Sequence, residues 1–411
     1  MSAPGSDMGL RGEARWLASG FLLMFGSGFG QTYFIALFVG HLKIDLGLSD
    51  GLFGSLYMAG TIASAALLMW AGKFVDRWPV RWFGVGVMAG LAAMALAMAS
   101  VSSAWMLAFV LFGLRFFGQG MMTHTAMTAM GRWFNRKRGR AVSIAGLGLP
   151  ASEGVMPLVA VAAIGLIGWR ATWLAGAALV ALVGFPILIV LLRRERTPTS
   201  GPASSGPAGP EDQTRHWTRG EVLRSPLFYA LLPGLMAPPF ILTGIFISQV
   251  AIVEMKGWQL SWFAASFTVM AGVHVVAALI SGWLIDRFGA RRLLPVVLLP
   301  LSAATFLLTV VDSAWVLIVF MVLVGFVVGG ISTVSGALWA ELYGTRHLGA
   351  IRAPVTAAMV FSTALAPGLI GVLLDAGVGL DIQLIGMTVY CVAAAVWMVV
   401  LMPRLNRMAV A

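Results

Sequence analysis

Three ionisable residues lie inside long apolar stretches of this 411-residue chain: Arg115, Glu153 and His274. A charge at the centre of a hydrocarbon layer costs at least about 2.5–3.5 kcal/mol on insertion scales, so such residues are functional by default. A guanidinium can hold a carboxylate through two parallel hydrogen bonds, a buried carboxyl group can load and release a proton, and an imidazole titrates near neutral pH. These residue types therefore predict anion binding and proton exchange.

Arg115 and Glu153 are expected at similar depths. Arg115 is about ten residues, or roughly 15 Å, from one end of its helix, and Glu153 is about twelve residues, or roughly 18 Å, from the opposite end of the next helix. The two side chains could pair, either to couple solute and proton or as a structural ion pair between the helices. His274 is equally consistent with a packed, hydrogen-bonded helix histidine, and His124 favours a packing or gating role.

The elements that hold these residues are predicted to be membrane-spanning helices. With 59% hydrophobic residues, 10% charged residues and a mean hydropathy of +0.92, the chain cannot fold as an ordinary water-soluble globule. The stretch MSAPGSDMGLRGEARW lacks the apolar core of a cleaved signal, so the first hydrophobic helix is expected to remain. Apolar runs near the ~20 residues that cross a bilayer predict twelve helices, at about 16–40, 50–72, 82–101, 104–130, 141–165, 170–192, 226–250, 259–284, 293–311, 314–340, 351–375 and 382–403.

Positive charges are concentrated in alternate loops. Of the 27 Lys and Arg residues, only Lys43, Arg115, Arg170 and Lys256 lie outside the termini and the even-numbered loops. The positive-inside rule then places both termini in the cytoplasm, as in a multi-pass protein of the cytoplasmic (inner) membrane. The net charge of +11 therefore reports topology and not nucleic-acid binding. The single cysteine, Cys391, excludes an internal disulfide and a multi-thiolate metal centre.

Two similar hinge segments lie 210 residues apart: GKFVDRWPVRW begins at Gly72, and GWLIDRFGARR begins at Gly282. The same offset relates Pro157 to Pro367 and the triplet SAW at 103–105 to that at 313–315, which indicates an internal duplication. The duplication predicts two six-helix bundles, residues 16–192 and 226–403, with a solute site between them near mid-membrane. Residues 1–15, 193–225 and 404–411 are then a cytoplasmic N-terminus, linker and tail.

Two features of the predicted linker point to its local structure. Residues 197–210 are rich in Pro, Gly and Ser and are expected to form a flexible tether. Thr218 and Glu221 have the spacing of a capping box, which predicts a short helix before the seventh span.

Each hinge segment is predicted to act as a gate on the cytoplasmic side. Its first glycine would let neighbouring backbones approach closely, and its aspartate would cap a helix end or pair with an arginine. The alternative is that these charges only mark a tight turn. The predicted gate residues are Gly72, Asp76, Arg77, Gly282, Asp286 and Arg287.

The hinge segments resemble the signature loops of the major facilitator superfamily, the second copy more fully, because the first has Trp78-Pro79 where the usual pattern includes a glycine. The resemblance implies an all-α membrane protein with twelve transmembrane helices in two pseudo-symmetric six-helix bundles, and a pathway lined by helices 1, 4, 7 and 10. Gly118-Gln119-Gly120 also resembles a compressed form of a helix-4 motif associated with proton coupling.

The expected pathway helices carry further candidate site residues. They are Gln31, Tyr33, Gln119, Gln249, Ser335 and Trp339. The alternative for such residues is that hydroxyls bond their own helix backbone and that aromatic rings lie at the lipid interface. Gly26, Gly28 and Gly30 are expected to serve helix packing.

The segment from Trp217 to Phe228 is similar to the helix-7 lead-in of the monocarboxylate transporter and oxalate:formate antiporter groups. The monocarboxylate transporters carry an Asp and, four residues later, an Arg on helix 8, whereas the corresponding positions here are His274 and Ala278. Their helix-1 lysine is also missing. Arg115 is then the one membrane-embedded cation left to hold an anion.

The preferred interpretation is a secondary active transporter for proton-coupled uptake of a small organic solute, with a carboxylate as the leading class. The alternative is a carrier of larger aromatic solutes, serving vitamin uptake or drug efflux, for which the Met and Trp content would suit an adaptable cavity. An enzyme is not expected, because no metal-ligand spacing, nucleophile–base set or phosphate loop occurs. No cofactor is expected, and the expected partners of the monomer are the solute, protons and the lipid bilayer.

Overall fold

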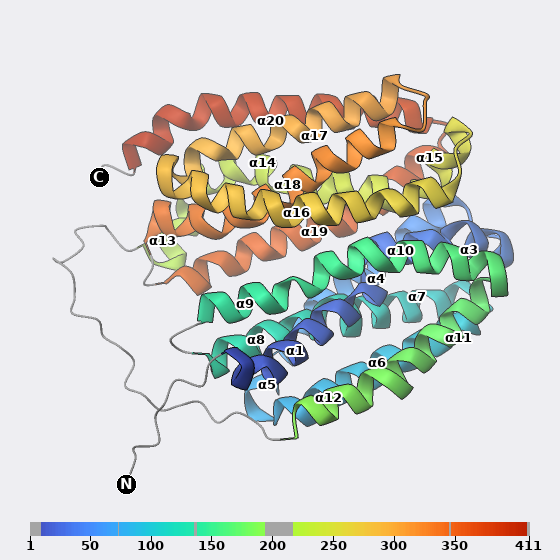
Figure 1. The fold of residues 1–411 in the computed structure, drawn as a ribbon. Helices are drawn as coiled ribbons and strands as arrows, with labels where there is room; N and C mark the ends of the chain where they lie inside the picture. Colours follow the sequence, from blue (N-terminus) through green and yellow to red (C-terminus); the bar gives the residue numbers. More distant parts are fainter. Residues whose placement is uncertain (1–9, 73, 135–137, 194–216, 345–346, 409–411) are drawn as a thin grey trace, which may run out of the picture.

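The computed structural model describes residues 10–72, 74–134, 138–193, 217–344 and 347–408, which form helices joined by short turns (Figure 1). The first half contains α1 (Leu10–Gly26), α2 (Thr32–Ile35), α3 (Val39–Leu46), α4 (Asp50–Ala71), α5 (Phe74–Arg77), α6 (Val80–Ala99), α7 (Ala104–Gly113), α8 (Thr123–Trp133), α9 (Arg138–Gly146), α10 (Gly148–Ile167), α11 (Trp169–Leu179) and α12 (Phe185–Leu191). The second half contains α13 (Arg219–Arg224), α14 (Pro226–Ile247), α15 (Gln249–Lys256), α16 (Leu260–Phe288), α17 (Ala290–Val310), α18 (Val316–Tyr343), α19 (Leu348–Asp375) and α20 (Leu380–Met408). Two 3-10 segments, η1 (Ser27–Gly30) and η2 (Ala36–Phe38), and two π-helical segments, η3 (Leu114–Met122) and η4 (Val180–Gly184), interrupt the first half.

Eleven helices of the described residues are long and apolar enough to cross a membrane, and a bent pair makes twelve if it is counted as one span. The pair joins Glu13–Gly30 to Thr32–Leu46 at an angle of 44°. The predicted fold class is therefore confirmed, but the prediction of one continuous first helix over 16–40 is wrong. The backbone becomes extended at Gln31 (φ −82°, ψ 152°), directly after a glycine-rich segment in which helix propensity is low.

The helices form two bundles, with α1–α12 in the lower part of Figure 1 and α14–α20 in the upper part. Their elements repeat at the offset seen in the sequence, because α4 and α16 begin at residues 50 and 260, and α6 and α17 begin at residues 80 and 290. Gly47 and Gly257 follow α3 and α15 with φ of 62° and 66°, a left-handed helix cap that favours glycine. The bundle limits at 192 and 226 remain a prediction, since residues 194–216 lie outside the described part of the chain.

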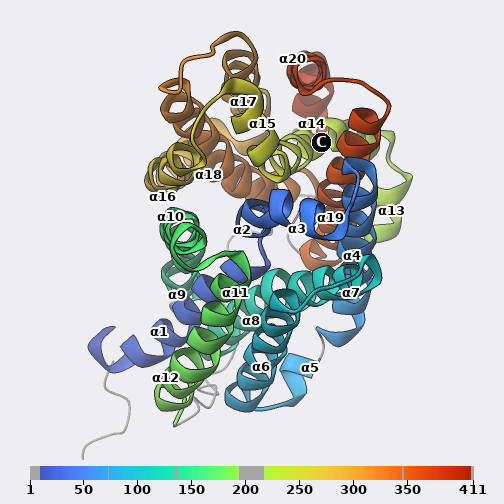
Figure 2. The ribbon, with the colours of Figure 1, turned by 90° about the vertical axis from the view of Figure 1, so that its right-hand side faces the viewer.

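The two bundles meet where α10 lies beside α16 and where α4 lies beside α19 (Figure 2). We call the end of the molecule that carries α3 and α15 the α15 end, and the opposite end the α13 end (Figure 1). At the α15 end, Ser49 Oγ donates a hydrogen bond to Asp375 Oδ2 at 2.7 Å, and Gly51 N donates to the same oxygen at 2.9 Å. A Cβ atom added at Gly54 or Gly371 would overlap the backbone of the facing helix. The bundles are thus sealed together at the α15 end, and their ribbons diverge toward the α13 end (Figure 1).

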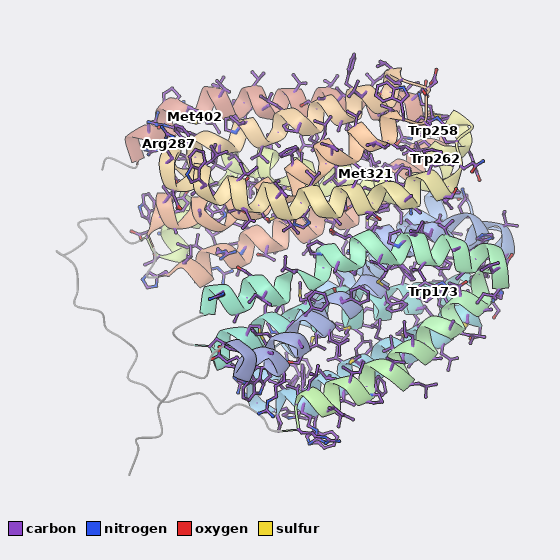
Figure 3. The ribbon with its side chains drawn as sticks, viewed as in Figure 1. Trp173, Trp258, Trp262, Arg287, Met321 and Met402 are labelled. Atoms are coloured by element: carbon purple, nitrogen blue, oxygen red, sulfur yellow. The ribbon has the colours of Figure 1, made fainter. Side chains whose placement is uncertain are left out.

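Side chains at the two ends suit a membrane interface. Trp258 and Trp262 lie at the α15 end, whereas Arg287 and Met402 lie near the α13 end (Figure 3). Aromatic and cationic side chains are favoured at the headgroup level, where a ring can be half-buried and a charge can reach water. Near the α13 end the predicted capping box of α13 is confirmed, because Thr218 and Glu221 exchange side-chain to backbone hydrogen bonds.

Candidate functional site

Arg115 lies in the π-helical segment η3 of the fourth span, and its side chain is almost completely buried. Its Nη1 donates hydrogen bonds to Gly30 O at 3.3 Å and to Thr32 Oγ1 at 3.2 Å. The guanidinium carbon also lies 5.3 Å from the centroid of the Tyr57 ring, and the Tyr57 hydroxyl is 2.8 Å from Thr32 Oγ1. Arg115 therefore donates hydrogen bonds to a carbonyl and a hydroxyl on either side of the break in the first span. Backbone groups at such a break lack hydrogen-bond partners within the helix.

No carboxylate pairs with Arg115 among the described residues, and its Nε is buried without a hydrogen-bond partner. The predicted pair with Glu153 is therefore wrong. The physical reason is local packing, since Gly30 and Gly118 bring the backbones of η1 and η3 into contact and direct the guanidinium to the break in the first span. The expected packing role of Gly30 is confirmed by the same contact.

Glu153 pairs instead with His274 across the two bundles. Its Oε2 atom lies 3.3 Å from His274 Nδ1, and both side chains are mostly buried. Glu153 is on α10, and His274 is at the middle of α16. Nearer the α15 end, Thr268 Oγ1 donates to Gly154 O at 2.6 Å, which is a second bond between the same helices. This contact is an ion pair only when the imidazole carries a second proton, and otherwise it joins a carboxylate to a neutral ring.

Tyr33 and Gln249 extend this contact between the bundles. The Tyr33 hydroxyl lies 2.7 Å from Oγ of Ser152, the residue before Glu153. Gln249 Nε2 donates to Tyr33 O at 3.2 Å, and the fully buried Gln249 Oε1 has no hydrogen-bond partner. The predicted residues Tyr33, Glu153, Gln249 and His274 therefore form one cluster, which we call the interface cluster.

The remaining cavity candidates differ in their surroundings. Gln31, Gln119 and Ser335 are half-buried, and their side chains make no hydrogen bond within the described part of the chain. Trp339 is fully buried and stacks on Tyr343 with ring centroids 6.0 Å apart. The three polar side chains therefore have donors and acceptors free for a ligand, whereas the Trp339 ring belongs to the packed core of the second bundle.

The first hinge is held by backbone carbonyls. His124 Nε2 lies 3.0 Å from Gly72 O, and Arg132 Nη1 donates to Val75 O at 2.9 Å. These contacts support the packing or gating role expected of His124. Arg77 is exposed, and the side chain of Asp76 lies outside the described residues.

The second hinge is organised differently from its prediction. A Cβ atom at Gly282 would meet open space, so the close backbone approach expected there is wrong. Asp286 and Arg287 are exposed, and Asp286 forms no ion pair with another described residue. The carboxylate that holds this hinge is Glu341 on α18, which accepts a hydrogen bond from the first N–H of α17 at 2.7 Å and pairs with Arg291 at 3.3 Å.

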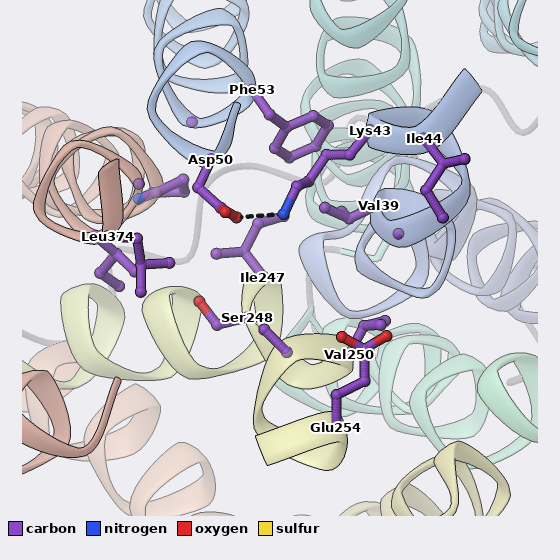
Figure 4. A pocket seen from close by; sticks show the side chains of 16 residues that line it. Val39, Lys43, Ile44, Asp50, Phe53, Ile247, Ser248, Val250, Glu254 and Leu374 are labelled. Carbon is purple, nitrogen blue, oxygen red and sulfur yellow. Dashed lines mark hydrogen bonds and ion pairs between the residues drawn. The ribbon is translucent and has the colours of Figure 1, made fainter. Parts of the chain in front are cut away.

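A cavity of about 160 Å³ lies between the bundles at the α15 end (Figure 4). In its wall, Lys43 Nζ is 2.6 Å from Asp50 Oδ1, and the Glu254 carboxylate faces the same space. The cavity is lined by α3 and α4 of the first bundle and by α14, α15 and α19 of the second. It therefore belongs to the sealed end of the interface and not to the interface cluster.

Sequence reasoning did not select several residues that complete these contacts. They are Tyr57, Ser152, Thr268, Glu341 and Asp375. Tyr57 carried the clearest signal, because a tyrosine in the middle of an apolar span needs a partner for its hydroxyl when it is buried. Ser152 and Thr268 carried little signal, since hydroxyls of this kind often bond their own helix.

Comparison with known proteins agrees with this architecture. The family model described as Major Facilitator Superfamily matches residues 20–273 and 256–409. Over 283 residues the chain is 25% identical to the MFS transporter asaE of Aspergillus flavus, a match that covers 68% of this chain and 61% of that relative.

Two solved structures show the same fold. A bacterial homologue of the human lysosomal transporter Spinster, in an inward-facing and occupied conformation, matches 98% of each chain with a TM-score of 0.70 and 16% identity. A mutant of the nucleoside transporter NupG matches 96% of this chain and 99% of its own, with a TM-score of 0.67 and 13% identity. Because the family model matches nearly its whole length, and eleven or twelve helices of its described residues can span a membrane, the chain belongs to the major facilitator superfamily.

Proposed function

We propose that the chain is a secondary active transporter that takes up a small organic anion, a carboxylate, together with a proton by alternating access. The observation that carries the proposal is the Glu153–His274 contact, in which a carboxylate and an imidazole of the two bundles lie 3.3 Å apart. The chain carries its Lys and Arg residues mainly in the loops of the α13 end, so we assign this end to the cytoplasmic side of the inner membrane.

The protonation of Glu153 and His274 can control the seal at the α15 end. With one proton on the pair, a carboxylate and an imidazolium attract each other across the interface, and this attraction is strong in a site of low dielectric constant. Loss of that proton to the cytoplasm leaves a carboxylate and a neutral imidazole, and the attraction weakens. Deprotonation therefore favours separation of α10 and α16, which returns the empty carrier to the outward-open form.

Arg115 supplies the positive charge for the anion. Its guanidinium is buried without a carboxylate partner among the described residues, and Gln31 and Gln119 leave amide groups free in the same region of the first and fourth spans. A planar guanidinium favours two parallel hydrogen bonds to a carboxylate. A solute carboxylate would therefore supply the negative charge that Arg115 lacks among the described residues.

Co-transport of one proton with one monocarboxylate moves no net charge. A pH gradient then drives accumulation and a membrane potential does not. A gradient of one pH unit corresponds to about 1.4 kcal/mol, so it supports at most about tenfold accumulation of the anion.

The test is uptake of labelled monocarboxylates into proteoliposomes with an alkaline interior. We expect accumulation that follows the pH gradient and that is unchanged by an imposed potential. The variant Glu153→Gln should lose gradient-driven accumulation but retain exchange of labelled for unlabelled solute, because its amide cannot carry the proton. Asp381→Asn, which removes an exposed carboxylate at the start of α20, is the matched control and should behave as the wild type.

Two results would reject parts of the proposal. Gradient-driven uptake that survives in Glu153→Gln would exclude the proton role of this residue. Saturable transport of aromatic solutes without any transport of carboxylates would favour the carrier of larger aromatic solutes.

A further inference from the structure

A second, larger cavity opens in the second bundle. It has a volume of about 490 Å³ and lies between α14, α19 and α20, away from the interface cluster. Its wall is mainly apolar and includes Phe240, Leu369, Leu373, Ile382, Met387 and Tyr390. We call it the α20 crevice. Its volume falls within the range of about 300–1,000 Å³ that is typical of small-molecule sites.

The internal repeat relates one wall residue of the α20 crevice to a large ring in the first bundle. In the first bundle, Trp173 is buried against Phe34 and Phe38, with ring centroids 5.3 and 4.8 Å apart. Residues 210 positions later in the second bundle are Gly244, Ser248 and Gln383. Gln383, in the wall of the α20 crevice, thus occupies the position of a large ring in the first bundle, whereas Gly244 is covered by Ile370 and Met387, and Ser248 lines the cavity at the α15 end.

Gln383 provides an unsatisfied polar group in the wall of the α20 crevice. Its Nε2 donates to Val378 O at 2.9 Å and to Ile370 O at 3.4 Å, which fixes the orientation of the amide. Its Oε1 has no hydrogen-bond partner, although the residue is only 7% exposed. A buried acceptor without a partner is unfavourable, so a donor from a ligand would stabilise this site.

The position of the α20 crevice matches the shape of a lipid. Gln383 is in the first turn of α20, at the α15 end, where headgroups lie, whereas Tyr390 is seven residues, or roughly 10 Å, deeper. The apolar wall therefore runs along the span, parallel to an acyl chain. The solvent that reaches an apolar opening at this depth is the hydrocarbon of the bilayer.

We propose that the α20 crevice binds a phospholipid, with one acyl chain between α19 and α20 and a headgroup N–H donor on Gln383 Oε1. An ethanolamine headgroup has this donor, and a choline headgroup lacks it because its nitrogen is fully methylated. A hydrogen bond to a charged group contributes about 1.5–3 kcal/mol, which predicts at least about tenfold tighter retention of phosphatidylethanolamine than of phosphatidylcholine.

The experiment is native mass spectrometry of the purified full chain with each of these two lipids, matched in acyl chains. Gln383→Leu removes the acceptor and should abolish the preference for phosphatidylethanolamine. Gly386→Phe places a ring in the α20 crevice, where a Cβ atom meets open space, and should lower the retention of both lipids. Gly165→Phe is the control, because its Cβ atom also meets open space but lies on α10.

Thermal unfolding of each variant shows whether it is folded. Equal retention of the two lipids by the wild type would overturn the headgroup contact. Wild-type retention of both lipids by folded Gly386→Phe would overturn the acyl-chain site.

Discussion

At the scale of single residues, Arg115 is a buried cation whose charge no carboxylate among the described residues offsets. Removing a charge from water costs several kcal/mol, and here the guanidinium gains one carbonyl, one hydroxyl and the face of a ring. This cost is explained if the missing counter-charge arrives with the solute. The same argument accounts for the free amides of Gln31, in the first span, and of Gln119, in the same segment as Arg115.

Replacing Arg115 by Met therefore has two opposite effects on stability. Loss of the hydrogen bond to Gly30 O leaves a buried acceptor unsatisfied, which costs about 1–3 kcal/mol, whereas loss of the uncompensated charge relieves a penalty of similar or larger size. Without solute, we expect the free energy of unfolding of Arg115→Met to lie within about 1 kcal/mol of the wild-type value, or to exceed it. A carboxylate at a hundred times its dissociation constant should stabilise the wild type by about 2.7 kcal/mol. This stabilisation should disappear in Arg115→Met.

Thermal unfolding with and without a panel of carboxylates measures both effects. Arg170→Met is the matched control, because Arg170 also donates to backbone carbonyls, Ala99 O and Val101 O, but is partly exposed at the α15 end. A carboxylate-dependent shift that persists in Arg115→Met would remove this residue from the anion site.

The residue scale also shows what a sequence can predict. Arg115, Glu153 and His274 were identifiable because the cost of burying their side chains is independent of the fold. Their partners were not identifiable, since Glu153 and His274 are 121 residues apart and their contact depends on the rotation of two helices about their axes. The Arg115–Glu153 pair was plausible from depth alone, but depth does not determine direction.

At the scale of elements, the break in the first span is the clearest departure from sequence reasoning. Hydropathy detects a span by its length and composition, and both are satisfied whether or not the helix continues through Gln31. The break forms because Gly30 packs directly on Gly118 and because Arg115 replaces the helical partner of a carbonyl. Both causes are tertiary contacts, so local propensity could only indicate that the segment was weak.

The contact of α4 with α19 leads to a prediction about the seal. Gly54 lies against the backbone of α19 at Pro367, and a larger side chain cannot fit there while the two helices touch. We expect Gly54→Val to force the α15 end open without unfolding either bundle, since the overlap is between bundles and not within one. A cysteine at Ser248, in the wall of the α15-end cavity, should then react faster with an impermeant maleimide added from outside.

The background for this measurement is Cys391→Ser, which leaves the chain without another cysteine. Gly86→Val, on α6 where a Cβ atom meets open space, serves as the matched control and should leave the reaction rate unchanged. Equal labelling of Gly54→Val and Gly86→Val would mean that the contact between α4 and α19 does not close this end.

At the scale of the whole molecule, the duplication made the architecture predictable. A repeat of 210 residues, alternate basic loops and twelve apolar segments restrict the chain to two related bundles. Which end of the interface is sealed was beyond this reasoning. The two conformations of a carrier contain the same helices, and their free energies differ by a few kcal/mol. Contacts such as that of Ser49 with Asp375 determine this difference, and no sequence pattern predicts them.

The last prediction concerns the exchange between these conformations. If the two bundles rock as rigid bodies between the two forms, opening the α15 end must bring the hinge segments of the α13 end together. Spin labels at Arg77→Cys and Arg287→Cys, both exposed positions related by the repeat, report the separation of these hinges. In the Cys391→Ser background we expect double electron–electron resonance to show one long distance between the two spin labels in the form with a sealed α15 end. Adding Gly54→Val should shift the population to shorter distances, whereas adding Gly86→Val should not. An opened α15 end with an unchanged hinge distance would show that the seal opens by local bending of α4 and α19, and alternating access by rigid-body motion would be excluded.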